Sequence, residues 1–303
     1  MLGIVILNYE NWEETVNCIN SIYTYRPSLD LNFKIYVVDN GSKNKPSKEF
    51  LSLIETGKEI ELLESEENLG FARGNNIGIR KAYKDNCDYV IVSNSDIYYR
   101  EGSLDELIRF YDTHSGICYP KIFNLQGEVP YIPYSYDTSL KQIYLRHTVL
   151  GKLLKRQFKV WCQNSINMNS EEVVENYLNA GSCFMLDKRS LNILRELDEH
   201  TFLYYEEMIL SKRAHENGIH IYYCPTSKVT HAIGKSTGKG SPFSRACMYQ
   251  SAIYYARSCL KCSRLVVYPL YLYFCLVYFA KVLSDKRYKG GFSDFNKRIR
   301  LYL

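Results

Sequence analysis

Residues 88–99 (DYVIVSNSDIYY) combine a short apolar run with a polar triplet that has the chemistry of a metal site. Residues 89–92 are apolar and rich in β-branched types, which predicts a buried strand. Asn94, Ser95 and Asp96 follow it closely. Ligands of open α/β sheets bind just outside the carboxyl ends of strands, where Asp96 could hold a divalent cation and the cation a diphosphate. On local grounds a plain turn explains the triplet equally well.

Three further polar clusters follow predicted strands. We expect strands over 3–7, 33–38 and 60–63, and helices over 12–25, 48–54 and 77–83. This alternation predicts βαβ units and a mostly parallel sheet. The carboxyl ends of parallel strands share one edge, so the polar clusters should converge there with the first triplet. They are residues 8–11, 39–42 and 68–76.

Two of these clusters have the composition of a nucleotide site. The carboxylate of Asp39 could accept from a base N–H or a ribose hydroxyl, although a turn before Asn-Gly is as good an explanation. Residues 68–76 contain two glycines, which allow close backbone approach, and Arg73, which can bind phosphate or a carboxylate. The segment is no GxGxxG motif, and the first strand leads into Asn-Tyr. Both facts count against a nicotinamide enzyme.

Composition limits the alternatives. The 303 residues suffice for one large or two modest domains, and a net charge of +5 is too small to indicate nucleic acid binding. The N-terminus MLGIVIL has neither a basic region nor a cleavage site, so we expect a reducing cytosol and free thiols for the ten cysteines. Cys259 and Cys262 form a single CxxC, for which a structural role is favoured over a zinc or redox site.

Four motifs together resemble a known family. In order they are VILNYEN (5–11), VVDNGS (37–42), ENLGFARGNN (67–76) and SNSD (93–96). The chain resembles family 2 glycosyltransferases of the GT-A fold, nearest to the rhamnosyltransferase-like enzymes of bacterial surface-polysaccharide synthesis. The resemblance covers about residues 1–238 and is weakest over 123–176. It implies an α/β, Rossmann-like, mostly parallel sheet flanked by helices.

The expected domain organisation follows from this resemblance. A glycosyltransferase domain would span 1–240, with a nucleotide-binding half of about 1–122 and an acceptor and catalytic half of about 123–240. A helical, basic and apolar tail would follow over 241–303.

The resemblance also implies the donor site. Mn²⁺ or Mg²⁺ would bind the diphosphate at Asp96, and Asn94 stands at the first position of the metal-binding motif, where it could supply only a neutral oxygen. His231 matches a late metal ligand of many members, although a lone histidine is more often structural. Base, ribose, diphosphate and donor-sugar contacts would come from Leu7, Asn8, Tyr9, Asp39, Gly70, Arg73, Asn75, Asn94 and Ser95.

Residues 197–207 resemble the family signature in which an acid at a helix start is the catalytic base. Glu207 would take the proton of the acceptor hydroxyl, with Glu206 beside it. Acids at a helix start also complement the helix dipole, so a capping role is the alternative. Ile209 stands where the family carries a further acid, which puts the acceptor class or the activity in question. Acceptor-side residues would be Gly181, Asp198 and Glu199.

Residues 265–280 contain no charge and are flanked by lysines and arginines. A spanning helix needs about 20 apolar residues. We therefore expect a helix lying in the interface, peripheral on the inner leaflet of the cytoplasmic membrane. A core helix or a homodimer contact is the alternative. The basic loop 234–240 could close over the diphosphate through Lys235 or Lys239, or be a plain surface loop.

These features lead to two hypotheses from different classes. The first is an inverting, metal-dependent glycosyltransferase of polysaccharide, O-antigen or capsule synthesis. It would take a UDP- or dTDP-sugar, with dTDP-rhamnose among the candidates, and a lipid-linked glycan acceptor. The second is a catalytically silent, membrane-associated binding subunit, suggested by Ile209 and Asn94. A nucleotidyltransferase is disfavoured, because no Gly-rich basic loop follows the first strand.

Overall fold

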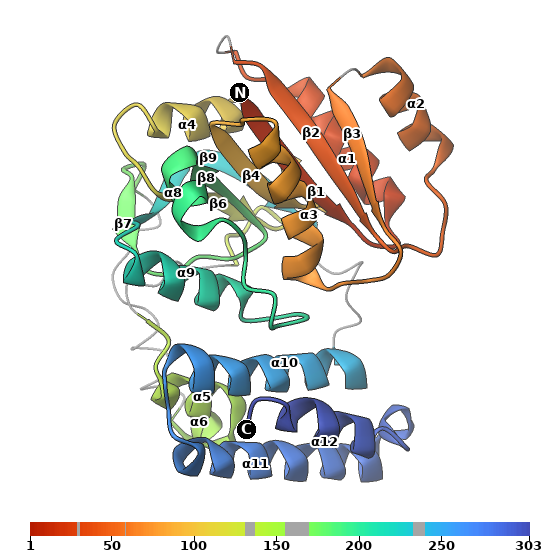
Figure 1. Cartoon of the computed structure of the whole chain (residues 1–303), viewed down its shortest axis with the longest axis vertical. Coiled ribbons are helices and arrows are strands. Elements are labelled where there is room, and N and C mark those ends of the chain that lie inside the picture. Colours follow the sequence, from red (N-terminus) through yellow and green to blue (C-terminus); the bar gives the residue numbers. More distant parts are fainter. Residues whose placement is uncertain (29–30, 58, 131–136, 155–169, 233–239) are drawn as a thin grey trace.

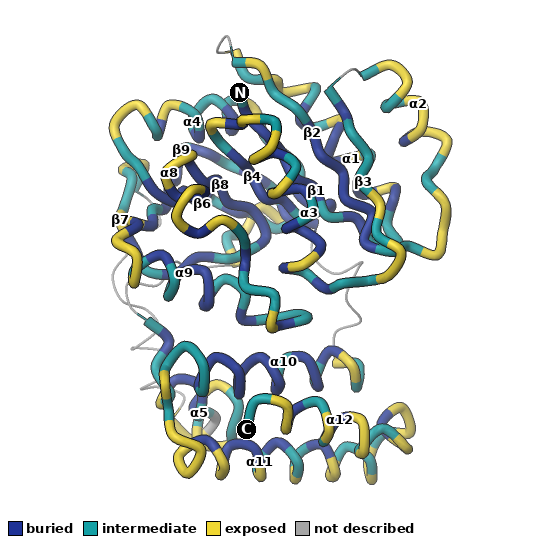
Figure 2. Tube along the Cα trace, viewed as in Figure 1, coloured by how far each residue is buried: buried dark blue, intermediate teal, exposed yellow. Residues whose placement is uncertain are grey.

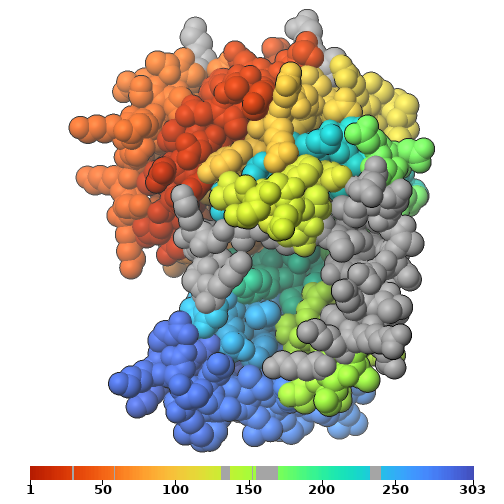
Figure 3. Space-filling model, turned by 180° about the vertical axis from the view of Figure 1, so that it is seen from behind, coloured from red at the N-terminus to blue at the C-terminus, as the bar shows by residue number. Residues whose placement is uncertain are grey.

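The computed structural model describes residues 1–28, 31–57, 59–130, 137–154, 170–232 and 240–303. A twisted sheet flanked by helices forms one end of the molecule, and a layer of C-terminal helices forms the other (Figure 1). Seen from behind, the C-terminal helices (blue) lie at the end opposite the first strands and helices (red to orange) (Figure 3). The tail helices are α10 (Pro242–Tyr254), η1 (Tyr255–Cys259), α11 (Arg264–Ser284), η2 (Lys286–Tyr288) and α12 (Phe292–Arg300).

The first half of the sheet is parallel, as expected. Its strands lie in the order β3-β2-β1-β4, with bounds β1 (Leu2–Asn8), β2 (Phe33–Asn40), β3 (Ile60–Ser65) and β4 (Tyr89–Asn94). The connecting helices are α1 (Trp12–Thr24), α2 (Lys48–Thr56) and α3 (Phe71–Lys84). In register, Asn8 lies opposite Asp39 and Leu7 opposite Asn94. Three of the predicted polar clusters therefore share one edge.

The second half of the sheet is mixed. The remaining strands are β5 (Ile97–Tyr99), β6 (Ile117–Phe123), β7 (Val174–Asn176), β8 (Cys183–Asp187) and β9 (Ile221–His231). β8 runs antiparallel to β4 and β6, and β9 pairs parallel with β6 but antiparallel with β5 and β7. β9 is long enough that His231, its last residue, lies in the sheet.

One helix start differs from the sequence expectation. α3 begins at Phe71 rather than at 77, so Arg73 and Asn75 lie inside the helix. α4 (Ser103–Phe110) is preceded by Gly102 at a φ of 72°. This left-handed cap conformation favours glycine. The other helices are α5 (Leu140–His147), α6 (Val149–Leu153), α8 (Lys188–Leu194) and α9 (Glu206–Glu216).

α3 lies unusually close to the sheet. A Cβ atom placed on Gly74 would come within 2.6 Å of Leu7 Cδ1, and one on Gly78 within 2.4 Å of Val5 Cγ1. Both contacts are far shorter than van der Waals packing allows, so a larger residue at either position would force Leu7 or Val5 to move. This approach brings the start of α3 onto the strand ends where the polar clusters meet.

The tail is joined to the sheet domain through a shared apolar cluster. Tyr205, Met208 and Ile209 at the start of α9 belong to the same buried cluster as residues of α10, α11 and α12. Tyr249 and Phe274 stack within it, with ring centroids 3.8 Å apart. The division of the chain near residue 240 stays a prediction, because these side chains pack across it.

α11 has one buried and one exposed face (Figure 2). Val267, Leu270 and Phe274 are fully buried against the other tail helices, whereas Leu272 and Leu276 are exposed. In the described part of the chain, α11 is the helix whose length and composition would suffice to cross a membrane. Its buried face nevertheless packs on the protein itself.

Candidate active site

Asp39 is held in place at the edge of the sheet by buried neighbours. The Asn8 amide Nδ2 donates to Asp39 Oδ1 and to Ser42 Oγ, each at 3.2 Å, and Thr15 Oγ1 donates to Asn8 Oδ1 at 2.9 Å. Both ends of the Asn8 amide are therefore used inside the protein, and they orient the Asp39 carboxylate. Leu7 and Tyr9 flank Asn8 and are half-buried.

Asn40 is a positioning residue that our sequence reasoning missed. Its Nδ2 donates to Asn68 Oδ1 and to the Gly70 carbonyl, each at 3.1 Å, and its Oδ1 accepts from the Leu69 N–H at 3.0 Å. One side chain thus fixes residues 68–70 against the end of β2. The sequence did contain a signal for this role, because Asn40 is the second polar residue after the strand predicted over 33–38.

Asn76 connects α3 to the segment before α9. Its Nδ2 donates to the Leu197 carbonyl at 3.0 Å and to Glu199 Oε1 at 2.9 Å, and its Oδ1 accepts from the Leu197 N–H at 2.8 Å. Arg80 donates to Glu199 at 2.6 Å, and Arg73 lies 3.7 Å from it. Burial alone would raise the pKa of Glu199, but the hydrogen bonds from Asn76 and Arg80 hold it below its usual range.

Three other predicted residues make contacts of different kinds. Asp198 accepts from the Tyr254 hydroxyl at 2.8 Å, which ties this segment to α10. Gly70 has a φ of 85°, and a Cβ on it would meet the Phe202 carbonyl oxygen at 2.4 Å. Asn75 donates to the Phe71 carbonyl within α3. Asp198 and Glu199 therefore join α3, the segment 197–203 and α10 to one another.

Asp96 and His231 meet at the end of the short β5–β9 ladder. His231 pairs in register with Ile97, and its Nε2 lies 3.1 Å from Asp96 Oδ1. Both side chains are almost buried, as is Ser95. Among the described residues no group of three or more His, Cys, Asp or Glu side chains could hold a metal. One carboxylate oxygen and one imidazole nitrogen nevertheless fit a divalent ion that takes its remaining ligands from diphosphate and water.

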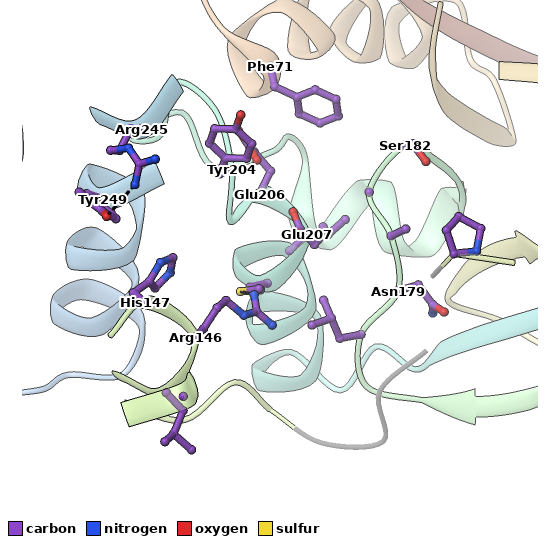
Figure 4. Close-up of a pocket in the computed structure, with 18 of the residues that line it drawn as sticks. Phe71, Arg146, His147, Asn179, Ser182, Tyr204, Glu206, Glu207, Arg245 and Tyr249 are labelled. Carbon is purple, nitrogen blue, oxygen red and sulfur yellow. Dashed lines mark hydrogen bonds between the residues drawn. The ribbon is translucent and has the colours of Figure 1, made fainter. Parts of the chain in front are cut away.

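A cavity of about 1340 Å³ lies between the sheet edge and the tail helices (Figure 4). Of the predicted residues, Asn94, Gly181, Glu206 and Glu207 line it. The sequence did not point to the lining from α5, α10 and α11, because those segments lack a recognisable motif. These residues are Arg146, His147, Arg245, Tyr249, Tyr273 and Val277.

The two acids reach the cavity through a strained turn. Tyr204 and Tyr205 have φ values of 74° and 73°, which is rare for two consecutive residues other than glycine. Their hydroxyls are bonded to Ser244 Oγ at 2.6 Å and to His147 Nε2 at 2.7 Å. These contacts to the tail and to α5 hold the turn that directs the first residues of α9 into the cavity.

The surroundings of the two acids separate their proton affinities. Burial and the charge of Glu207 raise the pKa of Glu206 to about 8. Burial also raises the pKa of Glu207, whereas the helix backbone and Arg146 oppose the rise. The charge of Glu207 adds to the rise at Glu206, whereas Arg146 opposes the rise at Glu207, so the surroundings favour protonation of Glu206 over Glu207. Gly181 lies close to the second acid, since a Cβ there would come within 3.2 Å of Glu207 Cβ.

Comparison with known proteins decides the family. The sequence profile of Glycosyl transferase family 2 matches residues 3–190. The chain belongs to glycosyl transferase family 2. The matched range includes the four polar clusters and Gly181, and the two acids of α9 lie beyond it.

Two curated relatives of this family 2 chain are transferases of glycan synthesis. The low-salt glycan biosynthesis hexosyltransferase Agl10 of Haloferax volcanii is 27% identical over 233 residues, which are 76% of this chain and 66% of that protein. The match thus spans just under two thirds of the relative. The N-acetylglucosaminyl-diphospho-decaprenol L-rhamnosyltransferase of Mycobacterium tuberculosis is 24% identical over 250 residues, 77% of this chain and 76% of the relative.

Solved structures show a similar fold. GalNAc-T7 with UDP, GalNAc and Mn²⁺ superposes with a TM-score of 0.60 and 15% identity, over 100% of this chain and 54% of that chain. S. aureus TarS 1–349 in complex with UDP-GlcNAc gives a TM-score of 0.52 and 16% identity, over 85% of this chain and 67% of that chain. The predicted α/β fold of GT-A type is thereby confirmed.

Ile209 has a packing role in this glycosyltransferase fold. Its side chain is 1% exposed and lies in the cluster that joins α9 to the tail. An ionised acid at this position would be buried among apolar groups at a large energetic cost. The departure from the family acid is therefore consistent with the presence of the tail. Lys235 and Lys239 of the basic loop lie outside the described residues.

Proposed function

We propose that this chain is an inverting, metal-dependent glycosyltransferase that moves a sugar from a nucleotide-diphosphate sugar to a hydroxyl of a lipid-linked glycan. The observation that carries the proposal is the pair Glu206 and Glu207 at the start of α9, exposed to a cavity that extends from Asn94 to the tail helices. A carboxylate in a cavity of this size has room for an acceptor hydroxyl beside it.

The chemistry is a single displacement. Ionised Glu207 takes the proton of the acceptor hydroxyl while that oxygen bonds to the anomeric carbon. The bond from the same carbon to the diphosphate oxygen breaks, and its electron pair leaves with the nucleoside diphosphate. Attack opposite the leaving group inverts the configuration. Glu206 carries a proton at neutral pH, so it can donate a hydrogen bond next to the base.

The donor would lie along the strand ends. The carboxylate of Asp39, held by Asn8 and Ser42, would accept a hydrogen bond from a ribose hydroxyl or from an N–H of the nucleotide base. Asp96 and His231 would hold Mn²⁺ or Mg²⁺, which offsets the charge developing on the leaving diphosphate. A UDP- or dTDP-sugar is the proposed donor class. Within this class, dTDP-rhamnose is one candidate, because one relative is named as an L-rhamnosyltransferase.

The acceptor proposal depends on the relatives and on the tail. The name of the Mycobacterium relative includes a diphospho-decaprenol acceptor. Here, α11 presents Leu265, Leu272 and Leu276 outward, and basic residues flank both ends of its apolar run. An apolar face with a cationic border suits the surface of an anionic membrane, so we place the protein at the cytoplasmic leaflet during polysaccharide synthesis.

A panel of UDP-, dTDP- and GDP-sugars with Mn²⁺ tests the proposal. A donor that binds the native state should raise the melting temperature, and this donor is then used to measure transfer or slow hydrolysis. Glu207→Gln should retain the donor-induced shift and lower turnover by about 10²–10⁴-fold. Glu216→Gln, the same change at the exposed end of α9, is the control and should behave as the native chain.

Three outcomes would contradict the proposal. Full transfer by Glu207→Gln would remove that residue from the role of base. Absence of binding by every donor with metal present would overturn the donor class. Donor binding without any turnover in the native chain would instead indicate the catalytically silent binding subunit.

A further inference from the structure

Two arginines line the tail side of the cavity. Arg146 opposes the rise in the pKa of Glu207, and neither arginine has yet been assigned a ligand. Arg146 comes from the last turn of α5 and Arg245 from the first turns of α10. Figure 4 shows both side chains around the space that Glu206 and Glu207 also face. Apart from these two arginines and the two acids, the described cavity lining carries no formal charge at neutral pH, since burial lowers the pKa of His147 to about 3.

Neither guanidinium has a carboxylate partner among the described residues. Arg245 donates from Nε to the Tyr288 hydroxyl at 3.0 Å and from Nη1 to the Tyr249 hydroxyl at 3.3 Å. Within the described part of the chain, Arg146 makes one hydrogen bond, from Nη1 to Met208 Sδ at 3.8 Å. Arg80, by contrast, binds the carboxylates of Glu196 and Glu199 directly. The cavity therefore holds two cations whose hydrogen-bonding capacity is largely unused, as an anion site requires.

Apolar residues of α6 and α11 line the cavity on the same side as these cations. Val149 lines the cavity and is exposed, and its N–H donates to the Tyr273 hydroxyl at 3.1 Å. Tyr273 and Val277 of α11 also belong to the lining. The same two helices carry Leu150, Leu272 and Leu276, which are exposed to solvent. We call this junction of α6 and α11 the apolar exit, because cavity lining and exposed leucines lie on the same two helices.

We propose that Arg146 and Arg245 bind the diphosphate of a lipid diphosphate acceptor, with the first part of the lipid chain leaving between α6 and α11. The inference rests on the proposed function and adds the substrate class and its residues. The ligand it describes has a dianionic head, an apolar chain on one side and a sugar on the other. That sugar would extend toward Glu207, where its hydroxyl is deprotonated.

The donor diphosphate is the other source of the same chemistry. Its place in the proposal is at the strand ends beside Asp96 and His231, which do not line this cavity. The arginines lie on α5 and α10, on the tail side of the acids, and they adjoin the apolar exit. A lipid chain needs an apolar surface to pack on outside the cavity, whereas a polar nucleotide does not.

Calorimetric titration of the full chain separates the two sources. Farnesyl diphosphate and inorganic pyrophosphate are titrated in EDTA, and UDP is titrated with Mn²⁺. We expect farnesyl diphosphate to bind without metal and more tightly than pyrophosphate, because its chain occupies the apolar exit. Arg146→Gln and Arg245→Gln should each weaken farnesyl diphosphate about tenfold or more, the loss of one charge-assisted contact. The affinity for UDP should stay within about twofold, because UDP makes no contact with either arginine in this proposal and a tenfold change would require the loss of one such contact.

Two further variants make the result decisive. Arg245→Lys should retain most of the affinity, because the charge persists. Arg298→Gln on α12 removes a half-buried arginine that also contacts neutral groups and lies outside the cavity, so it should change nothing. If Arg245→Gln fails to fold, Arg146→Gln decides the question, because its one contact is weak.

Unchanged farnesyl diphosphate affinity in the glutamine variants would overturn the inference. So would an equal loss of UDP affinity, or competition between UDP and farnesyl diphosphate in EDTA, since either would assign the arginines to the donor. Failure of the proposed function gives a different result, in which farnesyl diphosphate binds but no donor reacts. If a donor reacts but farnesyl diphosphate does not bind, only this inference is overturned.

Discussion

The imidazole Nε2 of His231 lies 3.1 Å from Oδ1 of Asp96, across the short antiparallel ladder of β5 and β9. Asn94, two residues before Asp96, has different surroundings. Its N–H donates to the Ser182 carbonyl at 2.9 Å, and its side chain lines the large cavity. The two ends of the triplet therefore face different partners, and only Asp96 has a second metal-ligating group beside it.

This division predicts unequal effects of two alanine variants. Asp96→Ala should lower Mn²⁺-dependent turnover by about 100-fold or more, because it removes the one anionic ligand, whereas Asn94→Ala should cost about tenfold or less. Turnover is measured over a Mn²⁺ titration for both. Equal losses in the two variants would contradict the separate roles of Asp96 and Asn94.

The raised pKa of Glu206 predicts how stability depends on pH. The carboxyl titrates near its ordinary value of 4.5 when unfolded and at about 8 when folded. Between these values the folded state binds more protons than the unfolded state, so the free energy of unfolding falls as pH rises. Glu206→Gln has no such carboxyl, so its free energy of unfolding should not fall in this way. Relative to the native chain, the free energy of unfolding of the variant should rise by roughly 1–3 kcal/mol between pH 5 and pH 8, a figure reduced for solvent screening in the open cavity.

Urea unfolding at several pH values measures this difference. Glu216→Gln, on the exposed end of the same helix, supplies the matched control, since its carboxylate has only a 3.8 Å contact to Lys212. Its stability difference from the native chain should be independent of pH over the same range. A Glu206→Gln difference that is flat with pH would mean that Glu206 ionises normally in the folded protein.

The sequence predicts local features better than contacts between distant segments. Strand ends such as Asn8 and Asp39 were recognisable because apolar runs and polar turns alternate at the expected period. The family signature likewise pointed to Glu207. Arg146 and Arg245 were not predictable, because they reach the cavity only through the packing of α5 and α10 on α9. Ile209 looked like a lost acid and is instead a core residue, which only the docked tail explains.

Asn76 carries another long-range contact, and its loss should be costly. Asn76→Ala would leave the buried N–H and carbonyl of Leu197 without their partners, so we expect a loss of about 1–3 kcal/mol in the free energy of unfolding. The adjacent Asn75→Ala removes only a bond to Phe71 within the same helix and should cost less. Denaturant titrations compare the two. A larger loss for Asn75→Ala would show that Asn76 does not anchor the segment before α9.

The exposed face of α11 predicts membrane binding. Replacing Leu272 and Leu276 by Glu puts two charges at the centre of this face, and vesicle affinity should fall at least about tenfold, because an apolar side chain contributes about 1.5–3 kcal/mol when buried. Cosedimentation with vesicles of anionic and neutral lipids measures it. Leu51→Glu on α2 is the control, since Leu51 and Leu272 are each 45% exposed. If the double variant binds vesicles normally and instead converts a dimer to a monomer, the face is a subunit contact.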